Sequence, residues 1–208
     1  IPISKAQSGP AARRSAWAVW TCAPHRVFFL PGALQLVASM LLMGWDIGGR
    51  TLGLWPAPQW SMPPAWAHAW LMVYGLFPWF IFGFALTAVP NWTGVRPTRR
   101  EWLAAGLPMI AGILVFYAGV LASREVAVAG GVLHLAGWVI GTAALTRIVF
   151  TAEGRDPQGV AIVVLLWTGA IGTAAFLLAI ATLRADWLAF ARDGGLWLVL
   201  LPVFLVVN

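Results

Sequence analysis

The chain has 208 residues, of which 61% are hydrophobic and 10% are charged, and its mean hydropathy is +0.83. A soluble domain usually carries about a quarter charged residues, so this composition excludes an ordinary soluble fold and indicates an integral membrane protein. The net charge of +6 would also suit a nucleic-acid partner. The basic residues lie between apolar segments and form no single patch, so we expect no nucleic acid. The single cysteine, Cys22, excludes an internal disulfide and a cysteine metal cluster.

Long apolar segments separated by short polar loops predict an all-α, polytopic transmembrane helix bundle with about six spans, since about 20 apolar residues cross a bilayer as a helix. Residues 1–24 are polar and mixed, and we expect a cytoplasmic or interfacial arm there; residues 25–208 would form the bundle. The chain has no initial Met and ends inside an apolar run, so we expect a piece of a longer protein. The expected spans are residues 27–45, 65–90, 102–122, 126–150, 160–183 and 195–208, the last one truncated.

The second expected span contains one ionisable side chain, His68, and ends in a tightly turning exit. Pro78 lies in the middle of this span, where its missing N–H would kink the helix. The exit from Val89 to Gly94 combines a proline, a turn-forming Asn, an interfacial Trp and a glycine. We therefore expect Pro90 to stop the helix at a membrane surface.

Two features predict how the later spans pack. The connection from Ser123 to Glu125 is so short that the third and fourth spans must form an antiparallel hairpin. Gly137 and Gly141 are four residues apart, which places both on one helix face and lets another backbone approach closely. We interpret these glycines as packing residues rather than cofactor contacts.

The distribution of basic residues predicts the orientation. Of the 13 Lys and Arg, nine lie on the side of the N-terminal arm and four on the opposite side. Cytoplasmic loops carry the excess of Lys and Arg, so we expect a cytoplasmic N-terminus.

Three histidines are the candidate ligands for a cofactor. His68 lies about one turn into the second span and His134 about two turns into the fourth, so both are expected near the outer face. Neutral imidazole is a usual ligand for iron and copper, and ionisable residues inside a membrane tend to be functional. The alternative is that each imidazole is a polar group satisfied by a backbone carbonyl or a partner helix. His25 precedes the first span next to Arg26, where a contact with lipid phosphate is the alternative.

Two short segments resemble motifs of the NnrS family: LTAVPNWTG at Leu86 to Gly94 and HRVFFLPGAL at His25 to Leu34. These are multi-helix proteins of the bacterial inner membrane that are associated with responses to nitric oxide and described as binding haem and copper. The chain resembles the first half of such a protein. The family motif, approximately W-H-A-H-E-M-L-F-G-F, places its first His on His68 and its Met on Met72. Its second His and its Glu fall on Trp70 and Leu71.

The resemblance implies haem b, copper or both. With the depth of His134 added, we expect cofactor contacts from His68, His134 and His25, and metal ligation by His68 and His134. The expected role is to bind the cofactor and to relieve or sense nitrosative stress, rather than to turn over a carbon substrate.

Two other functions remain open. Trp70 and Leu71, in place of polar residues, suit a structural or accessory subunit of a larger membrane complex that has no cofactor of its own. The kinked second span is the only hint of a small-solute transporter. All seven acidic residues are expected in loops or at span ends, which argues against ion coupling through buried carboxylates. We expect the lipid bilayer, and in the second case other membrane subunits, as partners.

Overall fold

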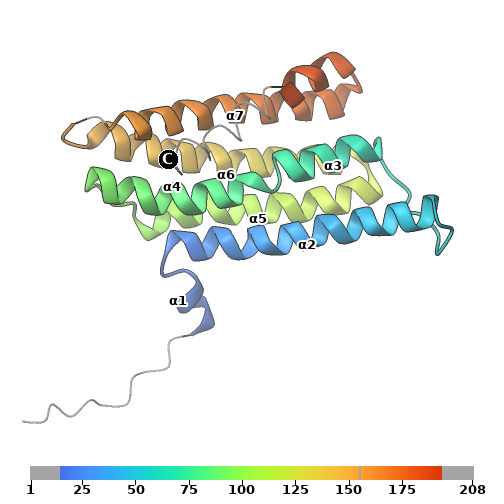
Figure 1. Cartoon of the computed structure of the whole chain (residues 1–208), viewed down its shortest axis with the longest axis horizontal. Coiled ribbons are helices and arrows are strands. Elements are labelled where there is room, and N and C mark those ends of the chain that lie inside the picture. The colour runs from blue at the N-terminus through green and yellow to red at the C-terminus, as the bar shows by residue number, and fades with distance from the viewer. Residues whose placement is uncertain (1–14, 155, 194–208) are drawn as a thin grey trace, which may run out of the picture.

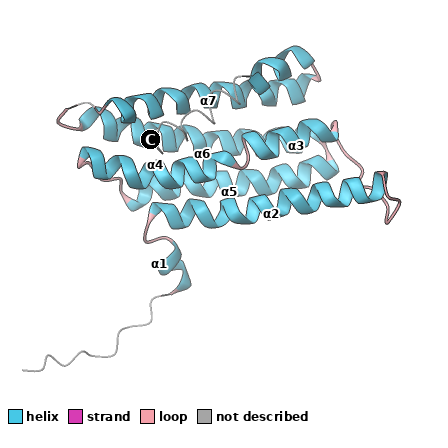
Figure 2. Ribbon diagram, in the orientation of Figure 1, coloured by secondary structure: helices cyan, strands magenta, loops and turns pink. Residues whose placement is uncertain are grey.

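The computed structural model describes residues 15–154 and 156–193, and within these residues it contains helices and no strand. The long helices lie side by side along the long axis of the bundle (Figures 1 and 2). The predicted all-α fold class is confirmed. The expected sixth span and residues 1–14 lie outside the described residues. The helices are α1 Ala16–Trp20, α2 Pro24–Arg50, α3 Pro64–Val73, α4 Phe77–Thr93, α5 Arg99–Ala122, α6 Arg124–Thr151 and α7 Pro157–Thr182, and residues 185–193 are also helical.

Five of these segments are long and apolar enough to cross a membrane. They are α2, the pair α3 and α4 taken together, α5, α6 and α7. In the lipid interior every backbone N–H and C=O needs a partner within the protein, which is why each apolar segment becomes a helix. Many large apolar side chains remain exposed on the bundle surface, where a bilayer would cover them.

The second span is broken into α3 and α4 by a turn at residues 74–76, which ends two residues before Pro78. A proline cannot donate to the carbonyl four residues earlier, so Pro78 leaves the Tyr74 carbonyl without its helical donor. The predicted kink is therefore confirmed, and it takes the form of a full break.

The helix ends within the expected exit from Val89 to Gly94, but Pro90 does not stop it, because α4 continues through Pro90 to Thr93. The helix ends instead at Gly94, whose φ of 74° is left-handed and favours glycine. The loop expected from residue 46 also begins later, since α2 runs to Arg50. Asp46 therefore lies within a helix, and its side chain is fully buried.

Helices α5 and α6 form the predicted antiparallel hairpin, joined at Ser123, whose side chain caps α6 by accepting from the Val126 N–H. Their backbones are almost in contact. A Cβ added at Gly112 would lie 2.3 Å from the backbone nitrogen of His134, and one added at Gly137 would lie 2.4 Å from the Ala105 carbonyl oxygen. The packing interpretation of Gly137 is confirmed.

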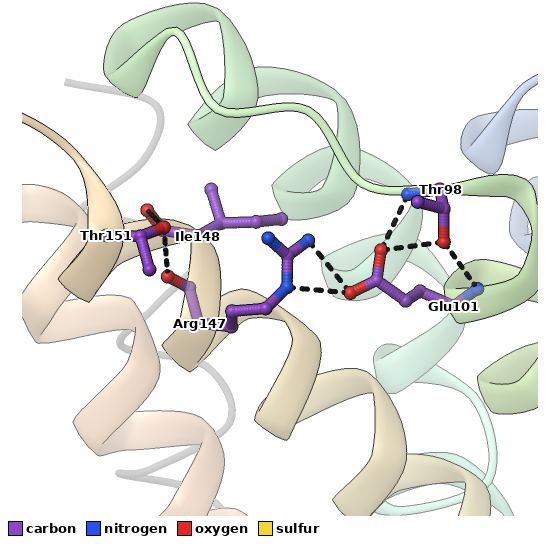
Figure 3. Close-up of polar contacts among 5 residues, drawn as sticks. All are labelled: Thr98, Glu101, Arg147, Ile148 and Thr151. Carbon is purple, nitrogen blue, oxygen red and sulfur yellow. Dashed lines mark hydrogen bonds and ion pairs between the residues drawn. The ribbon is translucent and has the colours of Figure 1, made fainter.

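Polar contacts tie the helices together at the end of the bundle where α5 begins. The Arg147 guanidinium of α6 donates to Glu101 Oε1 at 2.8 Å, and Glu101 also completes a capping box with Thr98 at the start of α5 (Figure 3). Arg99 donates to the Thr21 hydroxyl. The connection between α1 and α2 therefore lies at the same end as the loop between α4 and α5.

Candidate cofactor site around His68 and His134

The structure places the three histidines in different parts of the bundle. His68 is half-buried in α3, His134 is fully buried in α6, and His25 lies in the first turn of α2. The Gln35 side-chain amide donates to the Leu71 carbonyl at 3.3 Å, so the end of α3 lies beside the middle of α2. Ten residues of α2 separate His25 from that contact, which is about 15 Å along the helix axis. His25 therefore does not share a site with His68.

Both ring nitrogens of His134 contact backbone carbonyls. Nδ1 lies 3.2 Å from the Met109 oxygen of α5, and Nε2 lies 3.0 Å from the Tyr74 oxygen. The Tyr74 carbonyl is the one that Pro78 leaves unpaired, so the imidazole replaces the missing backbone donor. A neutral imidazole has one N–H, and the tautomer with the proton on Nε2 satisfies Tyr74. Nδ1 then carries no proton and faces the Met109 carbonyl oxygen, so neither nitrogen points toward a space that a metal could occupy.

Aromatic rings enclose His134. Its ring packs edge-on against Trp70 and Trp79, with centroid distances of 5.5 and 5.8 Å. Trp70 also stacks on Phe116 of α5 at 3.8 Å. Trp70 occupies the position of the second histidine in the sequence motif, so at this position the chain has an aromatic packing residue. The surroundings of His134 are those of a packed core.

His68 is different, because its Nδ1 is buried and has no hydrogen-bond partner. Residues two apart on a helix point in nearly opposite directions, so His68 faces away from Trp70 and from His134. Met72, four residues on, shares the face of His68, and its sulfur lies 3.5 Å from the Ser39 hydroxyl of α2. His68 and Met72 thus face the α2 side of α3, and the expected pairing of His68 with His134 is not formed.

The donor set would suit only a cofactor that needs few protein ligands. Within the described residues, no group of three or more His, Cys, Asp or Glu side chains lies close enough to hold a metal ion. A haem iron can be held by a single imidazole, and the ring of His68, whose Nδ1 has no hydrogen-bond partner, is available for that. His134 could ligate a haem iron only by losing its contacts to the Met109 and Tyr74 carbonyls. Which residues ligate a cofactor stays a prediction.

The sequence interpretation missed a buried polar stripe on α2. Gln35, Ser39 and Asp46 all lie on the inner face of this helix. Asp46 accepts hydrogen bonds from the Arg50 guanidinium and, at 2.7 Å, from the Trp60 indole N–H. The spacing of four and then seven residues places all three on one face, so helical periodicity was the available signal.

A family model described as NnrS protein matches residues 19–208. The chain belongs to the NnrS family. No curated protein and no solved structure matches it. For this NnrS chain, the five apolar segments and the family membership together establish a multi-helix membrane protein.

Proposed function

We propose that this NnrS-family chain binds haem through His68 and acts in the bacterial response to nitric oxide. The observation that carries the proposal is the buried, unpartnered Nδ1 of His68. An unpaired polar atom is costly inside a membrane, and most buried polar groups in proteins have a partner. A bound cofactor supplies a reason for this exception. A haem iron held by one imidazole keeps a second axial position for a small ligand such as nitric oxide.

The other residues of the region have supporting roles in this proposal. Met72 lies on the same helix face as His68 and brings a soft thioether, which suits iron in haem or copper(I). His134 holds α6 against the α3–α4 break and so fixes the position of α3. Copper remains a weaker proposal than haem, because the described residues offer no cluster of ligands for it.

A second candidate is a structural or accessory subunit of a larger membrane complex. It is favoured by the stack of Trp70 on Phe116, which fills the place of a polar motif residue with packing. In that case the partner of His68 would be a group on another subunit. The two candidates differ in whether the isolated chain carries a chromophore.

The test is an absorption spectrum of the full-length protein purified from its native membrane, with metal analysis of the same sample. We expect a haem Soret band and about one iron per chain. His68→Ala should remove the band, whereas His25→Ala, a matched change about 15 Å along α2 from the Gln35–Leu71 contact, should keep it. Cells carrying His68→Ala should also become more sensitive to a nitric oxide donor. A colourless, metal-free protein, or a band unchanged in His68→Ala, would overturn the haem proposal.

A further inference from the structure

A groove of about 370 Å³ lies between α5 and α6, at the end of the bundle where α5 begins and α6 ends. Three charged side chains line one part of it: Arg100, Glu101 and Arg147. Three alanines and one isoleucine line the rest. The groove therefore combines a charged mouth with apolar walls. Neither His68 nor His134 lines it, so the haem proposal does not account for it.

The apolar part of the groove is left open by small side chains on both helices. Ala104 of α5 and Ala143 of α6 are exposed there, and Ile140 of α6 is 39% exposed. Ile140 and Arg147 are seven residues apart, which is about two helical turns, so they lie on one face of α6 and about 10 Å apart along its axis. The groove thus runs from the charged end of α6 onto the apolar surface that a bilayer would cover.

The charged mouth has hydrogen-bond donors to spare. Both carboxylate oxygens of Glu101 are already occupied: Oε1 accepts from Nε and Nη2 of Arg147 at 2.8 Å, and Oε2 accepts from the N–H and the hydroxyl of Thr98 (Figure 3). These bonds leave Nη1 of Arg147 free to donate. Arg100 is exposed and makes no hydrogen bond or ion pair with any described residue. Two arginines against one glutamate leave one net positive charge at the mouth. Guanidinium groups are well suited to phosphate oxygens.

We propose that this groove binds an anionic phospholipid, with its phosphate between Arg100 and Arg147 and an acyl chain along the alanines toward Ile140. Basic pockets between membrane helices are a known form of site for such headgroups. A free phosphate ion would use the arginines and leave the apolar walls uncovered. A zwitterionic lipid would bring an ammonium group next to the net positive charge of the mouth. The anionic lipid is the occupant that complements both parts of the groove.

The test is native mass spectrometry of the purified full-length protein in detergent, with two lipids that have identical chains. Dioleoylphosphatidylglycerol is anionic and dioleoylphosphatidylcholine is zwitterionic. We expect the first phosphatidylglycerol to bind at least about fivefold more tightly than the first phosphatidylcholine, the effect of about one basic residue near a headgroup. Arg100→Gln should weaken phosphatidylglycerol binding by about fivefold for the same reason, and it breaks no contact within the protein. Ala143→Phe should also weaken it, because the ring would occupy the path of the acyl chain.

Arg96→Gln is the matched control, because Arg96 is exposed in the loop before α5 and does not line the groove. It removes the same charge from the same end of the bundle and should leave the affinity for phosphatidylglycerol almost unchanged. Equal losses in Arg100→Gln and Arg96→Gln would overturn the proposal and indicate a general attraction of anionic lipid to a basic surface. Equal binding of the two lipids, or an unchanged affinity in Ala143→Phe, would also overturn it.

Discussion

His134 Nε2 lies 3.0 Å from the Tyr74 carbonyl oxygen, the acceptor that Pro78 leaves without a backbone donor. On the surface of a soluble protein, water would donate a hydrogen bond to such a carbonyl, but no water is available in the interior of a membrane. The imidazole of α6 therefore completes the hydrogen bonding of a helix break 60 residues earlier in the chain. Pro78 and His134 are therefore complementary: Pro78 leaves the Tyr74 carbonyl without a backbone donor, and His134 takes the place of that donor.

The first prediction follows from this pair. His134→Ala should lower the free energy of unfolding by about 2–4 kcal/mol, because it leaves a buried carbonyl unpaired and a cavity beside Trp70 and Trp79. Thermal unfolding in detergent would measure this loss. His68→Ala is the matched control and should cost less than about 1 kcal/mol without cofactor, since no protein hydrogen bond is lost. Equal losses in the two variants would contradict the structural role of His134.

The second prediction concerns the close approach of α5 and α6. A Cβ at Gly119 would lie 2.1 Å from the Ala127 backbone nitrogen, and a backbone atom cannot rotate away. Gly119→Ala should therefore force the helices apart and destabilise the protein by about 1–3 kcal/mol. Gly44→Ala in α2 meets nothing within 4 Å and should leave stability unchanged or slightly raised. A neutral Gly119→Ala would show that the two backbones are not in contact.

The third prediction concerns the buried carboxylate of Asp46. The Trp60 indole donates to Asp46 at 2.7 Å, and this bond ties the loop after α2 back to the helix. Trp60→Phe should lower stability by about 1–2 kcal/mol, because hydrogen bonds to charged groups are stronger than neutral ones. The control is Trp45→Phe, whose indole donates to the Pro56 carbonyl from a more exposed position. Denaturation in detergent should rank Trp60→Phe as the more damaging change.

The sequence predicted those parts of the fold that depend on local composition. Apolar length locates the spans, and the short link at Ser123 requires the α5–α6 hairpin. Pro78 predicts an interruption because it removes a hydrogen bond wherever it lies within a helix. Pro90 shows the limit of this argument, because it removes the same hydrogen bond and yet α4 continues past it to Thr93.

The candidate site was harder to predict because it depends on which helix faces meet. Nothing near His134 in the sequence reveals that its partner is a carbonyl freed by Pro78. Likewise, the similar expected depth of His68 and His134 suggested one site, but depth does not fix the direction of a side chain around the helix axis. Asp46 was expected in a loop because a charged residue followed by two glycines and Arg50 is typical of the end of a span; the pairing of Arg50 with Asp46 four residues earlier lets the helix continue.

The fourth prediction tests the orientation, which the excess of Lys and Arg on one side predicts to be N-terminus inside. Cys22 is the only cysteine and is exposed, so it is a natural reporter for that side. A membrane-impermeant maleimide should label Cys22 only after the membrane is permeabilised. Leu52→Cys in a Cys22→Ser background lies beyond the opposite end of α2 and should react in intact spheroplasts. The reverse labelling pattern would place the N-terminus outside, because α2 separates these two positions by a full membrane span.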